Sequence, residues 1–212
     1  MINTFIGNNV KIGSNVVIGN NVVIENDVTI EDNCVISHGV IIGQSPQHLS
    51  FKNKKTGKII IGSGTHLREY CTVHLPINKK TVIGKNCFIM NHVNIGHDVR
   101  IGNNVVVSNG SQIGGHCFID DNVNLGLNCS IHQNTFIGAH SLIGMNTSVK
   151  NNVEPFSIIY QNKKSINITG IKRSEFKIYL RDIIDVKKNK KDFLSLDNKK
   201  AKDYFGKYNN EK

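Results

Sequence analysis

The residues best suited to chemistry lie in the middle of the chain, around His97 and Asp98. A neutral imidazole oriented by a carboxylate can accept the proton of an attacking hydroxyl or amine near neutral pH. Gly115 lies eighteen residues beyond His97, and a glycine backbone N–H can stabilise the oxyanion that forms when an acyl group is attacked. These residue types predict acyl transfer, provided that the fold brings His97 and Gly115 together.

A six-residue repeat determines how the chain must fold. An aliphatic residue recurs at every sixth position from Ile6 to Ile42 and again from Ile83 to Val149, and Gly often follows it. This period matches neither the face of an α-helix nor an alternating strand, but it is typical of short strands joined by tight corners in a parallel β-solenoid. The abundant Asn residues suit such corners, because Asn tolerates left-handed backbone conformations. The sequence therefore predicts an all-β solenoid.

The repeated phrase resembles the hexapeptide-repeat transferases. Their fold is a left-handed parallel β-helix with three faces and about 18 residues in each coil. At that period the resemblance places His97 at a corner, outside the core, directly below Gly115. The polar residues that would gather in or beside this column are His97, Asp98, Gly115, His116, His132 and Gln133.

Breaks in the repeat predict the domain organisation. We expect the β-helix to span residues 1–160, with inserted loops at 43–60 and 74–82, and loops of this kind commonly lie on the binding side. Residues 161–212 are expected to form a capping strand and a helical tail. Helical spacing predicts one helix within residues 173–188 and a weaker one at 197–205.

The five cysteines all occupy the small fifth position of a hexapeptide, where Val is usual. No C-x-x-C pair is present, and we therefore interpret the cysteines as small buried hydrophobic residues rather than redox or zinc-binding groups. They are Cys34, Cys71, Cys87, Cys117 and Cys129.

Charge is concentrated in the tail. The net charge is +10, of which +2 lies before residue 160 and +8 after it. A basic tail can bind an anionic carrier protein, nucleotide phosphates or nucleic acid, or it can simply be solvated. The beginning of the chain lacks the layout of a signal peptide, and no stretch is apolar enough for a membrane helix. We therefore expect a cytoplasmic protein.

A more specific resemblance covers about residues 83–176. The motifs "NIGHD", "GGHCFIDD", "IHQNTFIGAH" and "INITGIKR" resemble the UDP-N-acetylglucosamine O-acyltransferases of lipid A synthesis in order and spacing. The resemblance implies a homotrimer with active sites between subunits, and acyl-CoA or an acyl carrier protein as co-substrate, with no bound cofactor and no metal. It implies His97 as general base, Asp98 as its orienting group and Gly115 as oxyanion donor. The implied substrate-binding residues are His74, His116, His132, Gln133, Asn167 and Arg173. We also expect Gln47 and Asn94 to bind substrate.

Several positions depart from this pattern. The family has an Asp-x-Lys pair where Gln47 is followed here by His48 and Ser50, and it has a second histidine where this chain has Asn94. A glutamate and an arginine of the nucleotide motif are replaced by Thr169 and Ser174. Because these changes fall on sugar and nucleotide recognition, we expect the same reaction on a different sugar nucleotide.

We interpret the chain as an acyltransferase that acts on the amino group of a dTDP- or UDP-linked deoxyamino sugar for surface polysaccharide synthesis. The acyl group could be a 3-hydroxyacyl group. The alternative is UDP-N-acetylglucosamine 3-O-acylation in lipid A synthesis. The choice between amine and hydroxyl stays open, because a deprotonated amine is itself nucleophilic.

Two other classes of protein compete with this interpretation. The γ-class carbonic anhydrases resemble this chain in their solenoid and in the spacing of His92 and His97, and their zinc needs three protein ligands and an open position. Here His74 could supply the third ligand only if the inserted loop shifts register. A non-catalytic scaffold is the other alternative, but no aromatic residues alternate with the basic ones to suggest nucleic-acid binding.

Overall fold

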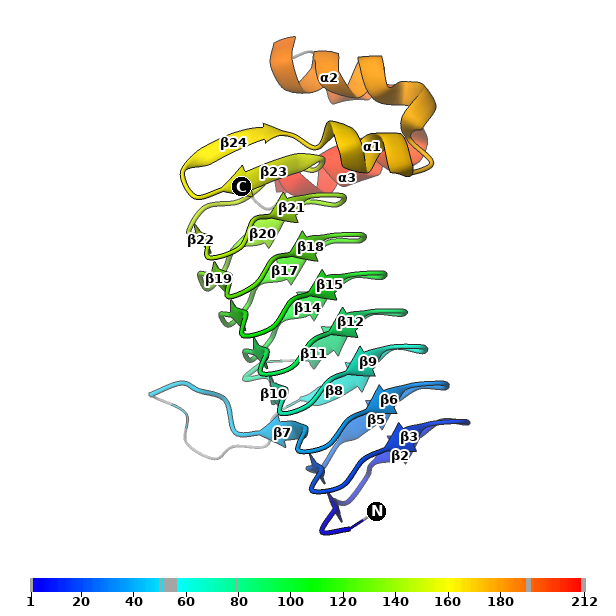
Figure 1. Cartoon of the computed structure of the whole chain (residues 1–212), viewed down its shortest axis with the longest axis vertical. Helices are drawn as coiled ribbons and strands as arrows, with labels where there is room; N and C mark the ends of the chain where they lie inside the picture. Colours follow the sequence, from blue (N-terminus) through cyan, green and yellow to red (C-terminus); the bar gives the residue numbers. More distant parts are fainter. Residues whose placement is uncertain (1, 50, 52–56, 79, 190–191, 211–212) are drawn as a thin grey trace.

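The computed structural model describes residues 2–49, 51, 57–78, 80–189 and 192–210. Its body is a left-handed β-helix of about eight turns. Three sheets, here called A, B and C, form the three sides of the prism, and the coils rise from the N-terminus toward a helical cap (Figure 1).

Each coil except the last contributes one short strand to each sheet, and β24 joins sheet C as an added antiparallel strand. Sheet A contains β1 (Phe5–Ile6), β4 (Val23–Ile24), β7 (Ile41–Gln44), β10 (Thr72–His74), β13 (Asn94–Ile95), β16 (Gln112–Ile113), β19 (Ser130–Ile131) and β22 (Ser148–Val149). Sheet B contains β2 (Lys11–Ile12), β5 (Val28–Ile30), β8 (Lys58–Ile61), β11 (Lys80–Ile83), β14 (Arg100–Ile101), β17 (Phe118–Ile119) and β20 (Phe136–Ile137). Sheet C contains β3 (Val17–Ile18), β6 (Val35–Ile36), β9 (His66–Leu67), β12 (Phe88–Ile89), β15 (Val106–Val107), β18 (Asn124–Leu125), β21 (Leu142–Ile143), β23 (Ser157–Tyr160) and β24 (Lys163–Ile166).

The strand register matches the period that the sequence predicts. Ile95 lies beside Ile113, and Ile113 beside Ile131, so equivalent residues stack at intervals of 18. These isoleucines belong to a continuous core of buried aliphatic residues. Many corners contain an Asn with a positive φ, as expected, and at two corners of sheet A the residue is Asp98 (φ 57°) or His116 (φ 59°). The left-handed backbone conformation of these corners therefore sets the direction of the Asp98 and His116 side chains.

The prediction for the cysteines is confirmed. All five are free and buried in the β-helix. Burial raises the pKa of Cys71 to about 12 and those of Cys87 and Cys117 to about 11. Because the thiolate is the reactive form of cysteine, these thiols are inert near neutral pH.

The inserted loops are shorter than the sequence predicts. The first connects β7 to β8 and spans residues 45–57, and the second connects β10 to β11 and spans residues 75–79. His74 therefore lies in a strand rather than in a loop. The loops are shorter because β7, β8, β10 and β11 extend beyond the hexapeptide pattern and still pair with neighbouring strands.

A helical cap closes the C-terminal end (Figure 1). Its elements are α1 (Ile168–Arg173), the 3₁₀ helix η1 (Lys177–Tyr179), α2 (Leu180–Asn189), the 3₁₀ helix η2 (Phe193–Ser195) and α3 (Lys199–Asn210). The helix predicted within residues 173–188 is present as α2, but it begins only at Leu180. Ser174 ends α1 instead of starting the predicted helix, because its hydroxyl donates to the Ile171 carbonyl and accepts from Phe176 N–H. The weaker helix is present and extends to Asn210. None of the helices in the described ranges is long and apolar enough to cross a membrane.

Candidate active site

One edge of the prism carries both inserted loops and most of the candidate residues. This edge, called the A/B edge, is the row of corners at which the chain passes from sheet A to sheet B. His97 and Asp98 lie between β13 and β14, and Gly115 and His116 lie one coil higher, between β16 and β17. The two loops leave the prism at the same edge, in the coils below.

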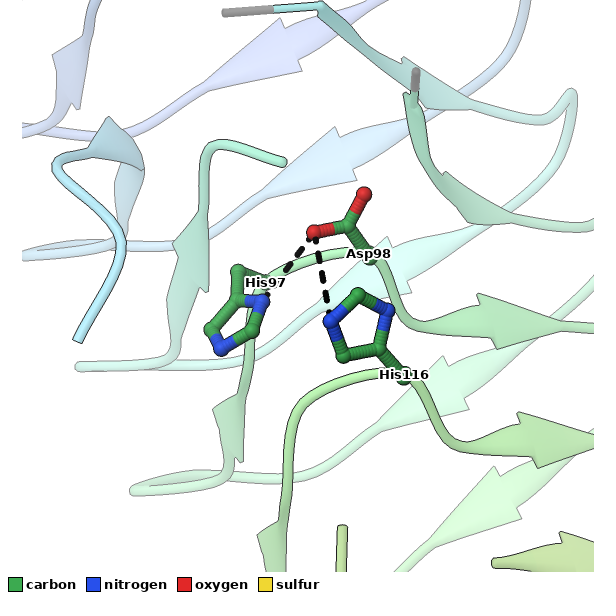
Figure 2. Close-up of side chains that lie close together, drawn as sticks. All are labelled: His97, Asp98 and His116. Carbon is green, nitrogen blue, oxygen red and sulfur yellow. Dashed lines mark hydrogen bonds and ion pairs between the residues drawn. The ribbon is translucent and has the colours of Figure 1, made fainter. Parts of the chain in front are cut away.

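His97 and Asp98 form a hydrogen-bonded pair on this edge. The Nδ1 atom of His97 lies 3.0 Å from Oδ2 of Asp98, and Figure 2 shows that the His116 ring faces the same carboxylate oxygen. His97 lies outside the aliphatic core, as expected, yet it is only 6% exposed. The rings of His48 and His116 stand edge-on to it, with ring centres at 5.9 and 4.9 Å. The imidazole is therefore enclosed by polar neighbours and held by its Nδ1 atom.

Asp98 also fastens the loop between β10 and β11. Its carboxylate accepts hydrogen bonds from Ile77 N–H (2.7 Å) and Asn78 N–H (3.0 Å). Burial opposes ionisation of Asp98, but the bonds from Ile77, the His97 ring and Asn78 outweigh it and hold the pKa of Asp98 below its ordinary value. A carboxylate that stays ionised fixes Nδ1 of His97 as a donor and leaves the lone pair on Nε2.

Gly115 presents a free N–H on the same edge. At a comparable corner, Asn103 N–H donates to the Asp121 carboxylate of the coil above, at 2.7 Å. The residue above Gly115 is Gln133, and within the described residues no acceptor is bonded to the Gly115 N–H. Gly115 also lies against the ring of His97, since a Cβ atom added to it would be 2.5 Å from His97 Nε2. A glycine whose N–H has no acceptor among the described residues thus lies next to the Nε2 atom of His97.

A pocket of about 310 Å³ opens beside these groups. Its lining includes the backbone of Gly96 and Gly114 and offers uncharged polar side chains, which suit the hydroxyl and amide groups of a sugar. The candidate residues among its lining are Gln47, Asn94, His97, Gly115, His132 and Gln133.

His74 supports the pocket from below. Its Nε2 atom lies 3.1 Å from Oδ1 of Asn94, and its Nδ1 atom lies 3.0 Å from the carbonyl of Ser45 in the first loop. Thr72 donates to the same Asn94 oxygen at 2.9 Å. His74 is 6% exposed, so in this subunit it positions Asn94 and the loop.

Thr81 is a residue that the sequence analysis missed. Its side chain is fully buried, accepts a hydrogen bond from Asp98 N–H (3.0 Å) and donates one to the His74 carbonyl (3.0 Å). One hydroxyl thereby links His74 to Asp98. Its only signal in the sequence is a hydroxyl at the small position where Val or Cys is usual.

The comparisons with known proteins agree with this architecture. The model described as bacterial transferase hexapeptide (six repeats) matches residues 2–31, 9–44 and 80–115, and the hexapeptide repeat of succinyl-transferase matches residues 117–151. Together these matches cover more than half of the chain. The chain belongs to the hexapeptide-repeat transferases.

One enzyme name recurs among the proteins that are similar to this chain. The acyl-[acyl-carrier-protein]–UDP-N-acetylglucosamine O-acyltransferase of Burkholderia vietnamiensis is 35% identical over 145 residues, which are 66% of this chain and 55% of that protein. The chain thus spans about half the length of the curated relatives it matches.

Two solved structures carry the same kind of name. A UDP-N-acetylglucosamine acyltransferase from Campylobacter jejuni is 25% identical, with a TM-score of 0.83, and the match covers 97% of this chain and 91% of that one. The enzyme of Francisella novicida is 31% identical, with a TM-score of 0.67 and coverage of 98% and 80%.

Not every candidate residue joins the pocket of this hexapeptide-repeat transferase. Asn167 is 9% exposed and lies in the cap, where its Oδ1 accepts from Gly170 N–H and its Nδ2 donates to the carbonyl of His140. Arg173 is exposed at the end of α1. Within this subunit neither residue reaches the A/B edge beside His97. Ser50, one of the departures from the pattern, lies outside the described residues.

The possible metal ligands differ from those the zinc hypothesis needs. His92 and His97 flank β13 on opposite sides, and the His92 ring stacks on Tyr70 at 5.3 Å. The group with suitable spacing is instead His97, Asp98 and His116, whose ligand atoms lie within 4.8 Å of one another. An ion bound there would replace the hydrogen bond between His97 and Asp98, so metal binding and base catalysis would exclude each other.

Proposed function

We propose that the protein transfers an acyl group from a thioester to a hydroxyl group of a UDP-linked amino sugar. The observation that supports this proposal is the close approach of His97 Nε2 to Gly115, whose N–H has no bonded acceptor among the described residues. The names of the similar proteins favour a hydroxyl acceptor over the amine that the sequence analysis preferred. N-acylation of a deoxyamino sugar is not confirmed.

In the proposed reaction, Nε2 of His97 takes the proton of the acceptor hydroxyl as its oxygen attacks the thioester carbonyl. The N–H of Gly115 donates to the oxyanion of the tetrahedral intermediate. Asp98 stabilises the imidazolium through Nδ1. Collapse of the intermediate breaks the carbon–sulfur bond, and the imidazolium returns its proton to the departing thiolate, so His97 ends the cycle neutral.

We assign the sugar to the pocket that Gln47, Asn94 and Gln133 line beside His97. The donor thioester would belong to an acyl carrier protein or to coenzyme A, as a co-substrate rather than a bound cofactor. We further propose a homotrimer with the sites between subunits, because His116, His132 and Gln133 are exposed in a single subunit and a second subunit would enclose them.

The experiment that tests this function measures free thiol released from 3-hydroxyacyl thioesters of acyl carrier protein and of coenzyme A. Each donor is paired with UDP-N-acetylglucosamine or with a dTDP-linked 4-amino-4,6-dideoxy sugar. Release with UDP-N-acetylglucosamine supports O-acylation. Release with the amino sugar alone would identify the protein as an N-acyltransferase instead. No release with any pair of donor and acceptor would argue against acyl transfer to these sugars.

A further inference from the structure

A second pocket, here called the cap pocket, lies between β24 and the helices α2 and α3. Figure 1 shows these elements at the C-terminal end of the molecule. Glu154 also lines the pocket, at the place where the chain passes from sheet B to sheet C. The cap pocket is therefore formed by residues of one subunit, on a part of the prism other than the A/B edge. Its volume of about 930 Å³ is in the range of pockets that enclose small organic ligands.

Apolar and aromatic side chains from every element around the cap pocket contribute to its wall. The rings of Phe193 and Phe205 stack with their centres 6.3 Å apart, and Phe205 is only 6% exposed, so this part of the wall is fixed. Covering such a surface with hydrocarbon removes it from water and is favourable. The apolar lining residues are Ile166, Ile168, Val186, Phe193, Phe205 and Tyr208.

The charges in the cap pocket are unequal. Its lining contains three lysines, Lys164, Lys187 and Lys188, and one carboxylate, that of Glu154. The Oε2 atom of Glu154 lies 3.0 Å from Nζ of Lys164 and 3.3 Å from Nζ of Lys187. One carboxylate thus serves two ammonium groups, and three positive charges against one negative charge leave a net charge of +2. A ligand that fills the apolar space should therefore carry a negative charge.

Lys187 supplies charge to the cap pocket without being free to contact a ligand. Its Nζ atom donates to the Pro155 carbonyl (2.7 Å) and lies 2.9 Å from the Ser157 hydroxyl, in addition to Glu154, and its side chain is only 4% exposed. Burial lowers the pKa of Lys187 to about 8, although Glu154 favours the charged form. A bound anion would favour that charged form further. Direct contacts to the anion must come from Lys164 and Lys188, which are exposed.

We propose that the cap pocket binds a hydrocarbon chain that ends in a carboxylate. The chain lies against the apolar wall, and the carboxylate contacts Lys164 and Lys188. A carboxylate suits this pocket better than a phosphate ester, because no arginine is among the described residues that line it, and paired hydrogen bonds from arginine favour phosphate. Binding needs no acyl transfer at His97, so this site goes beyond the proposed function.

Isothermal titration of the full chain with decanoate, below the concentration at which it forms micelles, tests the proposal. Decanol and decyltrimethylammonium keep the hydrocarbon chain but carry no charge or a positive one. We expect decanoate to bind at least about tenfold more tightly than either, the scale for one charge-assisted contact. Hexanoate should bind at least about tenfold more weakly than decanoate, because it buries fewer methylene groups.

Substitutions in the cap pocket locate the binding. Lys164→Ala and Lys188→Ala should each weaken decanoate binding about fivefold to tenfold. Ile168→Ser should weaken it through lost apolar contact, and the fold should tolerate this change because Ile168 is 41% exposed. The matched control is Lys177→Ala, which removes an exposed lysine of η1 that is not part of the lining, and it should leave binding unchanged.

Three results would overturn the proposal. Decanoate does not bind, or decyltrimethylammonium binds as tightly as decanoate, or decanoate binds equally to the wild type, Lys188→Ala and Ile168→Ser. The last result would place decanoate elsewhere, for example beside His97. Decanoate binding that depends on Lys188, in a protein that shows no acyl transfer, would retain the cap pocket and remove the proposed function.

Discussion

Gly115 lies against the ring of His97 so closely that one added methyl group would be 2.5 Å from the Nε2 atom. The glycine is required at this position by its neighbour rather than by its own backbone, because its φ is not positive. In the same coil the N–H of Gly115 has no bonded acceptor in the described part of the chain. In the proposed reaction, the thioester carbonyl would lie between this donor and the Nε2 atom of His97.

Gly115→Ala should therefore damage catalysis more than folding. The new methyl group would displace the imidazole from its position, and we expect turnover to fall by about 10²-fold, the scale for losing an oxyanion donor or a base. Gly206→Ala is the control, because a Cβ atom there meets nothing within 4 Å and alanine favours the interior of α3. Thiol-release rates and thermal melting of both variants provide the test, and near-wild-type turnover in Gly115→Ala would contradict the assigned geometry.

His97→Gln removes the base while keeping a polar side chain of similar reach. Turnover should fall by about 10²-fold or more if His97 accepts the proton of a hydroxyl. Melting behaviour and oligomeric state should be retained, because the ring lies outside the aliphatic core. The measurement is kcat for thiol release, with sedimentation and thermal melting as controls. A variant that keeps its full rate would indicate an acceptor amine that attacks unaided.

Thr81→Val tests whether the hydroxyl positions Asp98. The substitution keeps the shape of the side chain but leaves Asp98 N–H and the His74 carbonyl without their buried partner, at a cost of about 1–3 kcal/mol. We expect kcat to fall about tenfold with little change in KM, and the melting temperature to fall. Thr81→Ser, which retains the hydroxyl, should restore kcat. Equal kcat in both variants would show that the Thr81 hydroxyl has only a structural role.

The repeat explains how much of this site could be predicted. Because equivalent residues stack every 18 positions, the spacing of His97, Gly115 and Gln133 alone places them in one column, and the structure brings them together as expected. The bonds from Ile77 and Asn78 to Asp98 could not be predicted, since the loop that contains them interrupts the repeat and has no equivalent coil to align with.

Thr81 was missed for a different reason. Hydroxyl residues occupy the same small position in other coils, where Thr65 donates to the Gly84 carbonyl and Ser111 to the Gly126 carbonyl of the ladder above. Only the displaced chain after β10 gives Thr81 the carbonyl of His74 as its acceptor. A single sequence therefore cannot distinguish a hydroxyl that supports the site from one that supports the core.

The cap offers a prediction about pH. His140 is buried between Phe156, Phe176 and Tyr204, and this burial, assisted by the charge of Lys200, lowers its pKa from 6.5 to about 4. In the unfolded chain His140 becomes protonated below about pH 6.5, whereas in the folded chain it stays neutral down to about pH 4. Stability must therefore fall with decreasing pH in this interval, and from pH 7 to pH 5 the loss should be about 2 kcal/mol.

His140→Phe should remove this dependence, because a phenyl ring fills the same aromatic cluster and cannot be protonated. The free energy of unfolding can be measured in urea at pH 7, 6 and 5 by tyrosine fluorescence, since the chain has no Trp and Tyr204 lies in the cluster. In His140→Phe the difference between pH 7 and pH 5 should shrink by about 2 kcal/mol. His92→Phe, which replaces an exposed histidine stacked on Tyr70, should keep the wild-type difference. If both variants retain the full pH dependence, the acid sensitivity arises elsewhere and His140 is not the group that couples protonation to unfolding.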